Sequence, residues 1–93
     1  MTWPKTFNVR LTWAHVSDGM KGCSTCPIAL AIKDRGYHGT VGDRSATVSL
    51  PTGENAEYRL PERARAFVRQ FDSGGGPWPI SFRMTLIPTP RWT

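Results

Sequence analysis

Two cysteines, Cys23 and Cys26, have a spacing that suits chemistry. C-x-x-C is the spacing of paired zinc ligands, and His15 and His38 are the only histidines that would complete a four-ligand site. At the start of a helix the same spacing also suits a thiol-redox site, because the helix N-terminus stabilises a thiolate. A third interpretation is favoured: Cys26 is a small buried apolar residue and Cys23 is a loop thiol that is normally reduced in a cytoplasm.

The motifs of the common enzyme classes are missing from the sequence. No carboxylate pair stands out for acid–base work, no serine lies in a nucleophile elbow, and no Walker pattern occurs. The run Gly74-Gly75-Gly76 follows a helix, so no helix N-terminus is directed at a phosphate there. A single C-x-x-C also lacks the second pair that makes a zinc motif specific. We therefore expect a non-enzymatic protein with no catalytic residues and no cofactor.

The elements that must position these residues follow from the apolar periodicity. Alternating apolar and polar residues predict strands over residues 6–14, 45–50, 56–60 and 80–87. One helix is expected from Thr25 or Cys26 to Gly36, with Pro27 in its first turn and Ser24 or Thr25 as its cap. A second helix is expected from Pro61 to Asp72, with one apolar stripe formed by Ala64, Phe67, Val68 and Phe71.

These elements predict an α+β fold of order β-α-β-β-α-β. An antiparallel sheet with two helices on one face buries every apolar surface, which is the split βαβ arrangement of ferredoxin-like folds. Residues 1–87 would form one domain, and residues 88–93 an extended proline-containing tail. The side chains expected to point inward from the strands are Phe7, Val9, Leu11, Trp13, Ala46, Val48, Leu50, Ala56, Tyr58, Leu60, Ile80, Phe82, Met84 and Leu86.

The charge of the chain favours an anionic partner. Nine arginines and three lysines stand against seven acids, which gives a net charge of +5. The open sheet face would carry Arg10, Arg59 and Arg83 among hydroxyl groups, which suits phosphate contacts. Because the strand aromatics point inward, we expect backbone contact rather than base stacking on the sheet. Nucleic-acid binding through these residues would be helped by the second helix, with Arg63, Arg65 and Arg69. The alternative is an ordinary solvated face.

Tryptophans outside the strands indicate a second kind of partner. Trp3, Trp78 and Trp92 lie next to prolines or near the chain ends, and exposed tryptophan is a frequent interface anchor. A host bacterial protein is then the predicted partner, bound or inhibited through the tryptophan-bearing ends. Self-association is the milder version, so the chain would be a monomer or a homodimer. Alternatively, Trp3 and Trp92 pack together where the termini meet.

The apolar runs of the chain bear on its location. The longest, Ile28 to Ile32, is too short to span a bilayer, and no apolar stretch follows Lys5 as a signal peptide requires. We expect a cytoplasmic protein with no membrane partner.

Several segments together resemble small accessory proteins of unknown function encoded by phages of actinobacteria. The resemblance covers most of the chain and implies a phage-encoded accessory protein in the host bacterial cytoplasm, without implying any activity. The preference for arginine over lysine fits a GC-rich genome. The segments that carry the resemblance are Gly22-Cys23-Ser24-Thr25-Cys26-Pro27-Ile28-Ala29-Leu30-Ala31, Leu60-Pro61, Ala66-Phe67-Val68, Phe71-Asp72-Ser73-Gly74 and Pro79-Ile80-Ser81-Phe82.

Overall fold

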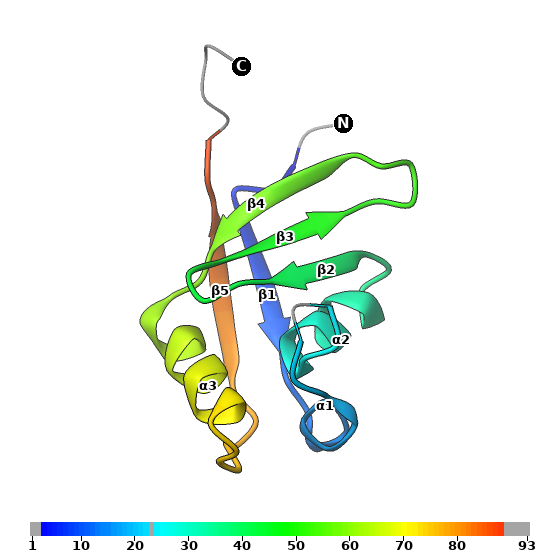
Figure 1. Ribbon diagram of the computed structural model, residues 1–93. Helices are drawn as coiled ribbons and strands as arrows, with labels where there is room; N and C mark the ends of the chain where they lie inside the picture. The colour runs from blue at the N-terminus through cyan, green and yellow to red at the C-terminus, as the bar shows by residue number, and fades with distance from the viewer. Residues whose placement is uncertain (1–2, 23, 89–93) are drawn as a thin grey trace.

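The structure, a computed structural model, describes residues 3–22 and 24–88 (Figure 1). Within these residues one five-stranded sheet is combined with three helices. The elements in chain order are β1 (Thr6–Arg10), α1 (Trp13–Asp18), α2 (Pro27–Asp34), β2 (His38–Val41), β3 (Ser45–Ser49), β4 (Asn55–Arg59), α3 (Glu62–Asp72) and β5 (Ser81–Leu86).

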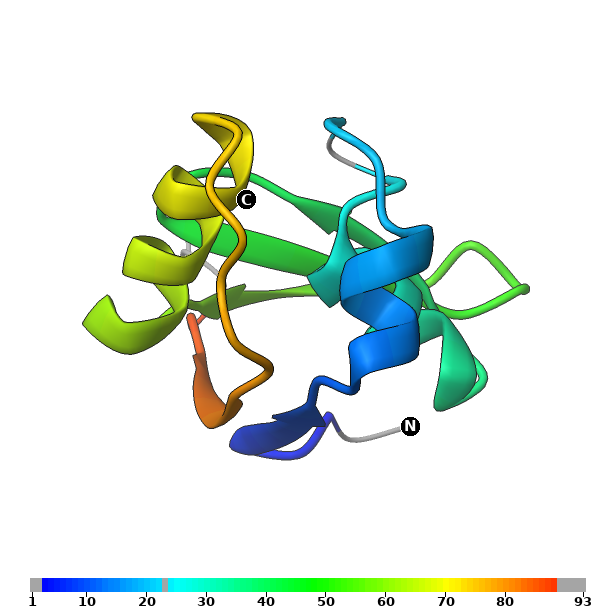
Figure 2. The ribbon, with the colours of Figure 1, turned by 90° about the horizontal axis from the view of Figure 1, so that it is seen from below.

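The sheet is antiparallel throughout and curls around the helices. Its strand order is β1-β5-β4-β3-β2, so β1 and β2 are the two edges. α2 contacts both edge strands, which places it across the opening of the curled sheet. Figure 2 shows α3 on one side and α1 on the other, with the sheet wrapping around the space between them.

The predicted α+β class is confirmed, whereas the ferredoxin-like order is wrong. The order of elements is β-α-α-β-β-β-α-β, and β1 pairs antiparallel with β5 at one edge of the sheet. In a split βαβ arrangement the first strand would instead lie inside the antiparallel sheet, with a neighbouring strand on each side. The difference arises from one helix and one strand that the apolar pattern did not reveal.

The unexpected helix, α1, interrupts the predicted strand 6–14 after Arg10. Thr12 caps it: its hydroxyl accepts a hydrogen bond from the His15 N–H at 3.3 Å, and the Thr12 N–H donates to His15 Nδ1 at 3.0 Å. The apolar residues Leu11 and Trp13 continue the alternation of β1 and hide this start. Trp13, predicted to point inward, is 56% exposed, so that prediction is wrong.

The unexpected strand, β2, has two buried positions, and a glycine rather than an apolar side chain occupies the first of them. Gly39 lies directly beneath α2, where an added Cβ would stand 3.0 Å from Ile32 side-chain atoms. Glycine therefore allows α2 to approach the edge of the sheet closely. Since glycine adds nothing to an apolar alternation, residues 38–41 resemble a loop in the sequence.

The core otherwise forms as the alternation predicts. Most of the predicted inward strand residues are buried, and the apolar side chains of α2 and α3 belong to the same cluster, so these two helices cover one face. Val68 and Phe71 of the α3 stripe are half-buried, as are Leu50, Ala56, Ile80 and Leu86 of the strands. The buried strand residues are Phe7, Val9, Leu11, Ala46, Val48, Tyr58, Leu60, Phe82 and Met84.

The first predicted helix corresponds to α2, with a different cap. Pro27 is its first residue, as expected, but the N-cap is Cys26, and no side chain caps the helix. The helix therefore starts without the predicted Ser24 or Thr25 cap. It ends before Gly36, whose φ of +89° is the left-handed conformation that glycine adopts readily.

The predicted C-terminal tail lies only partly within the described residues. Pro88 is exposed beyond β5, whereas residues 89–93 of the predicted tail lie outside the described residues. Among the described residues, none of the helices has the length and apolar character needed to cross a membrane.

Candidate functional site

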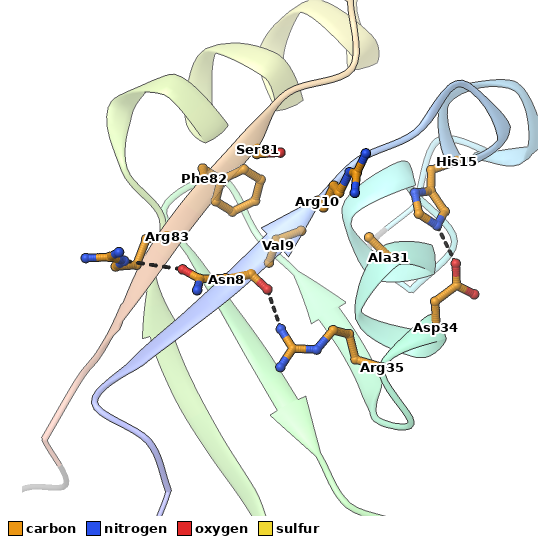
Figure 3. Close-up of a pocket in the computed structure, with 10 residues that line it drawn as sticks. All are labelled: Asn8, Val9, Arg10, His15, Ala31, Asp34, Arg35, Ser81, Phe82 and Arg83. Carbon is orange, nitrogen blue, oxygen red and sulfur yellow. Dashed lines mark hydrogen bonds and ion pairs between the residues drawn. The ribbon is translucent and has the colours of Figure 1, made fainter.

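A shallow groove of about 790 Å³ lies where β1, β5 and α2 meet (Figure 3). We call it the Asn8 groove, after the residue at its centre. Its polar side chains include three guanidinium groups and one carboxylate. The lining residues are Asn8, Val9, Arg10, His15, Ala31, Asp34, Arg35, Ser81, Phe82 and Arg83.

Asn8 holds two of these arginines in fixed positions. Its side-chain oxygen Oδ1 accepts a hydrogen bond from Arg83 Nε at 3.2 Å, and its backbone carbonyl accepts one from Arg35 Nη1. The Arg35 guanidinium also stacks on the Phe7 ring, 4.4 Å from its centroid. Figure 3 shows the two arginines on opposite sides of Asn8, with the terminal nitrogens of Arg83 pointing away from it. These terminal nitrogens remain available to an anion.

The carboxylate of the groove is paired with a histidine. Asp34 Oδ2 lies 2.5 Å from His15 Nε2, and this contact joins α1 to α2. Because His15 Nδ1 accepts from the Thr12 N–H, both ring nitrogens of the histidine already have partners. His15 thus fixes the position of α1 and has no free nitrogen for proton transfer or metal binding.

A second groove, of about 560 Å³, lies beside β4 and α3. We call it the Arg59 groove. Arg44, Arg59 and Arg65 line it together with Ser45, Leu60 and Ile87, and no acidic residue belongs to this lining. Arg65 is held by a hydrogen bond from its Nε to the Asp43 carbonyl at 3.3 Å. Glu57, the acid next to the groove, accepts a hydrogen bond from the Ser45 hydroxyl at 2.9 Å.

The strand register connects the two grooves across the open face of the sheet. Arg10 pairs with Ser81 and Asn8 with Arg83, so Arg10 and Arg83 are diagonal neighbours on β1 and β5. Arg59 pairs with Thr85, which makes it a diagonal neighbour of Arg83 on the other side. Diagonal neighbours in a sheet lie about 7–8 Å apart, within reach of long side chains.

We define the arginine band as the three arginines connected in this way and two further arginines that line the grooves beside them. Among the described residues, none of its members forms an ion pair with a carboxylate. Three of them, Arg10, Arg59 and Arg83, were expected from the sequence, whereas Arg35 and Arg44 were not, because both follow the ends of regular elements. The arginine band consists of Arg10, Arg35, Arg44, Arg59 and Arg83.

The predicted arginines of α3 have a different environment. Glu62 accepts a hydrogen bond from Arg69 Nη2 at 2.7 Å and forms a longer ion pair with Arg65 at 3.4 Å. The Arg69 hydrogen bond and its positive charge lower the pKa of Glu62 below its ordinary value. Of the three, only Arg65 lines a groove; Arg63 and Arg69 line neither of the two.

Within the described residues, the side chains predicted to bind a metal or to act as a redox pair do not lie together in one site. Cys26 is buried at the start of α2, His15 is paired with Asp34, and His38 is exposed on β2; Cys23 lies outside the described residues. No cluster of three metal-ligating side chains occurs within residues 3–22 and 24–88. Burial raises the pKa of the Cys26 thiol, which opposes formation of a thiolate.

The predicted partner-binding tryptophans differ in how far they are exposed. Trp3 is half-buried, packs against the core and lies 6.2 Å from the Tyr37 ring. Trp78 is 75% exposed and contacts Trp13, which the sequence analysis had assigned to the core. Trp92 lies outside the described residues.

Comparison with known proteins assigns no function to these grooves. Comparisons with protein-family models, with curated proteins and with solved structures find no match to this chain. The function must therefore be inferred from the grooves, the arginine band and the exposed side chains.

Proposed function

We propose that the protein is a non-enzymatic binder of nucleic acid that contacts the phosphate backbone through the arginine band. One observation carries the proposal: the antiparallel register brings Arg10, Arg83 and Arg59 of three adjacent strands onto one exposed face, beside two grooves and without carboxylate partners among the described residues. Guanidinium groups match phosphate oxygens in charge and in hydrogen-bond geometry.

The neighbours of the band suit a phosphate ligand as well. Ser81 pairs with Arg10, Thr85 with Arg59, and Ser45 with Arg59 on its other side. The hydroxyl groups of Ser81 and Thr85 supply additional hydrogen bonds to phosphate oxygens, whereas the Ser45 hydroxyl already donates to Glu57. Because Asn8 already orients Arg35 and Arg83, these two side chains lose less conformational entropy on binding.

The environment of His15 supports the non-enzymatic part of the proposal. It is the histidine of the Asn8 groove, and both of its ring nitrogens are engaged by Thr12 and Asp34. A general base must reach the proton that it removes, and the hydrogen bonds to Thr12 and Asp34 leave no ring nitrogen of His15 free to do so.

Two alternatives from the sequence remain predictions. Binding of a host protein through Trp3, Trp78 and Trp92 is supported at Trp78 by its exposure, whereas Trp3 packs against the core. A zinc or redox role for Cys23 and Cys26 has less support, because Cys26 is buried. A phage origin and a location in the host cytoplasm likewise remain predictions, and the binding proposal does not depend on them.

Fluorescence anisotropy with labelled single- and double-stranded oligonucleotides at several salt concentrations tests the proposal. We expect affinity to fall steeply with salt, because bound phosphates release their counterions. Replacing one contacting arginine, as in Arg83→Gln, should lower the log–log salt slope on single strands by about 0.7. Arg63→Gln removes the same charge from α3 and should leave the slope almost unchanged.

Absence of binding to either oligonucleotide at low salt would refute the proposal. So would equal effects of Arg83→Gln and Arg63→Gln, because the protein would then respond to net charge rather than to the arginine band. Circular dichroism of each variant checks that the fold is retained.

A further inference from the structure

Two exposed tryptophans form a pair at one end of the molecule. The rings of Trp13 and Trp78 are edge to face, with centroids 5.2 Å apart, although the residues lie in different segments. Trp13 is 56% exposed and Trp78 is 75% exposed. Single exposed apolar side chains are ordinary, but a contiguous exposed pair of large aromatic rings is the kind of patch that marks a binding surface.

Both tryptophans are held on rigid backbone. Trp13 is the first residue of α1, directly after the Thr12 cap and within the segment that His15 ties to Asp34. Trp78 stands between Pro77, which is buried, and Pro79, which is half-buried. Proline restricts its own backbone and that of the residue before it, so Trp78 has little freedom to withdraw from the surface.

The pair lies at the end of the arginine band. Arg10 and Ser81 form the last pair of the β1–β5 ladder, and the Leu11 N–H donates to the Ile80 carbonyl at 2.9 Å just beyond it. Trp13 follows Arg10 by three residues, and Trp78 precedes Ser81 by three. The Asn8 groove includes both Arg10 and Ser81, so a chain lying in this groove would reach the end of the ladder beyond which the two tryptophans lie in the sequence.

We propose that the preferred ligand is single-stranded nucleic acid, whose phosphates lie along the arginine band while an unpaired base stacks on the Trp13–Trp78 pair. This inference rests on the proposed function and specifies its ligand. A stacking platform next to a positively charged groove is the combination with which proteins hold single strands. A duplex offers the same phosphates, but its bases are already stacked on each other inside the helix. The tryptophans therefore discriminate between the two forms.

The test compares oligo(dT), oligo(rU) and a DNA duplex of equal length, by anisotropy at one salt concentration. We expect Trp78→Ala to weaken binding of single strands about 5- to 150-fold, the range measured for one base–aromatic stack, and to leave duplex binding unchanged. Trp13→Ala should act in the same direction. Trp78→Phe keeps a stacking ring and should retain most of the affinity, and tryptophan fluorescence should be quenched by oligo(dT). Comparing the DNA and RNA strands shows whether the site distinguishes the sugar.

The possible failures are distinguishable. If single strands and duplex bind equally and Trp78→Ala changes neither, while Arg83→Gln weakens both, the proposed function stands and the stacking inference is wrong. If no oligonucleotide binds at low salt, the proposed function itself fails. If Trp78→Ala instead abolishes self-association without affecting binding, the pair is a contact between copies of the chain, which also overturns the inference. Circular dichroism of Trp78→Ala and Trp78→Phe confirms that each variant folds.

Discussion

The open face of the sheet and helix α3 both carry three of the arginines expected to bind nucleic acid, yet their environments differ. On α3, Glu62 pairs with Arg69 at 2.7 Å and with Arg65 at 3.4 Å, whereas Arg63 has no carboxylate partner among the described residues and lines neither groove. On the sheet, Arg10, Arg59 and Arg83 have no carboxylate partner among the described residues, and the neutral amide of Asn8 orients Arg83. A basic site therefore depends on the positions of the acids and of the grooves, and not on the number of arginines alone.

Charge reversal at the centre of the arginine band should give the largest effect. Arg59→Glu replaces a charge-assisted phosphate contact with repulsion, and we expect nucleic-acid affinity to fall by about 100-fold. Arg63→Glu makes the same charge change on α3 and should reduce affinity by less than about 5-fold, through long-range repulsion alone. Anisotropy titrations at about 50 and about 200 mM salt measure both, because electrostatic binding to nucleic acid weakens strongly over this range. Equal losses would remove the distinction between the two regions.

A single substitution should make the band resemble α3. Asn8→Asp keeps the shape of the side chain but places a carboxylate beside Arg83 and close to Arg35. The new ion pair competes with phosphate, so we expect binding to weaken by about 10-fold. Asn8→Ala, which removes the orienting oxygen without adding charge, should cost only about 3-fold. An Asp variant that binds as well as the wild type would mean that Asn8 does not organise the site.

The reciprocal change should make α3 resemble the band. Glu62→Gln releases Arg65 and Arg69 from their acidic partner, and we expect nucleic-acid affinity to rise by about 2-fold. Arg65 accounts for most of this gain, since it lines the Arg59 groove. Glu54→Gln, which removes an exposed acid in the β3–β4 turn, is the matched control. An equal gain from the control would show that only net charge matters.

The ion pair between Glu62 and Arg69 predicts a lowered pKa for the Glu62 carboxyl. Arg69 lowers the pKa of this carboxyl in the folded protein, so the ion pair contributes to α3 at neutral pH. That contribution is complete above the pKa of Glu62 in the unfolded chain and is lost as the pH falls through the lowered folded value. NMR titration of the side-chain carboxyl should show the lowered pKa, and Arg69→Gln should return it toward its ordinary value. An unchanged midpoint in that variant would contradict the pairing.

The smallest effect on binding is expected at Cys26. In a Cys23→Ser variant the remaining thiol is buried with a raised pKa, so Ellman's reagent should react with it at least about 10-fold more slowly in native protein than in urea. Nucleic-acid affinity should not change, because Cys26 lines neither groove of the arginine band. Rapid reaction of the native thiol would instead favour the redox alternative.

The sequence predicts the regions of this fold in which apolar periodicity and secondary structure coincide. The inward faces of β1, β3, β4 and β5 and the stripe of α3 follow directly from alternating or helical spacing. The start of α2 at Pro27 follows from the geometry of proline, although its predicted hydroxyl cap does not form. These features depend on residues close together in the chain.

Features that depend on distant contacts could not be predicted in this way. β2 has a glycine at one of its two buried positions because Ile32 of α2 packs on it, and only the folded protein brings these residues together. Arg35 joins the site because it reaches Phe7 and Asn8 of β1, far away in the sequence. Trp13 continues the alternation of β1, yet the capping contact between Thr12 and His15 turns the chain into α1 and exposes the ring.

Chemical-shift mapping with ¹⁵N-labelled protein and oligo(dT) tests the central claim most directly, because it locates the ligand on the surface. We predict that the Nε–Hε signals of Arg10, Arg59 and Arg83 and the amides of β1 and β5 shift on titration, and that the indole signals of Trp13 and Trp78 shift with them. The signals of Arg63 and Arg69 should stay in place. Shifts centred on α3, or spread evenly over all the arginines, would contradict the assignment of binding to the arginine band.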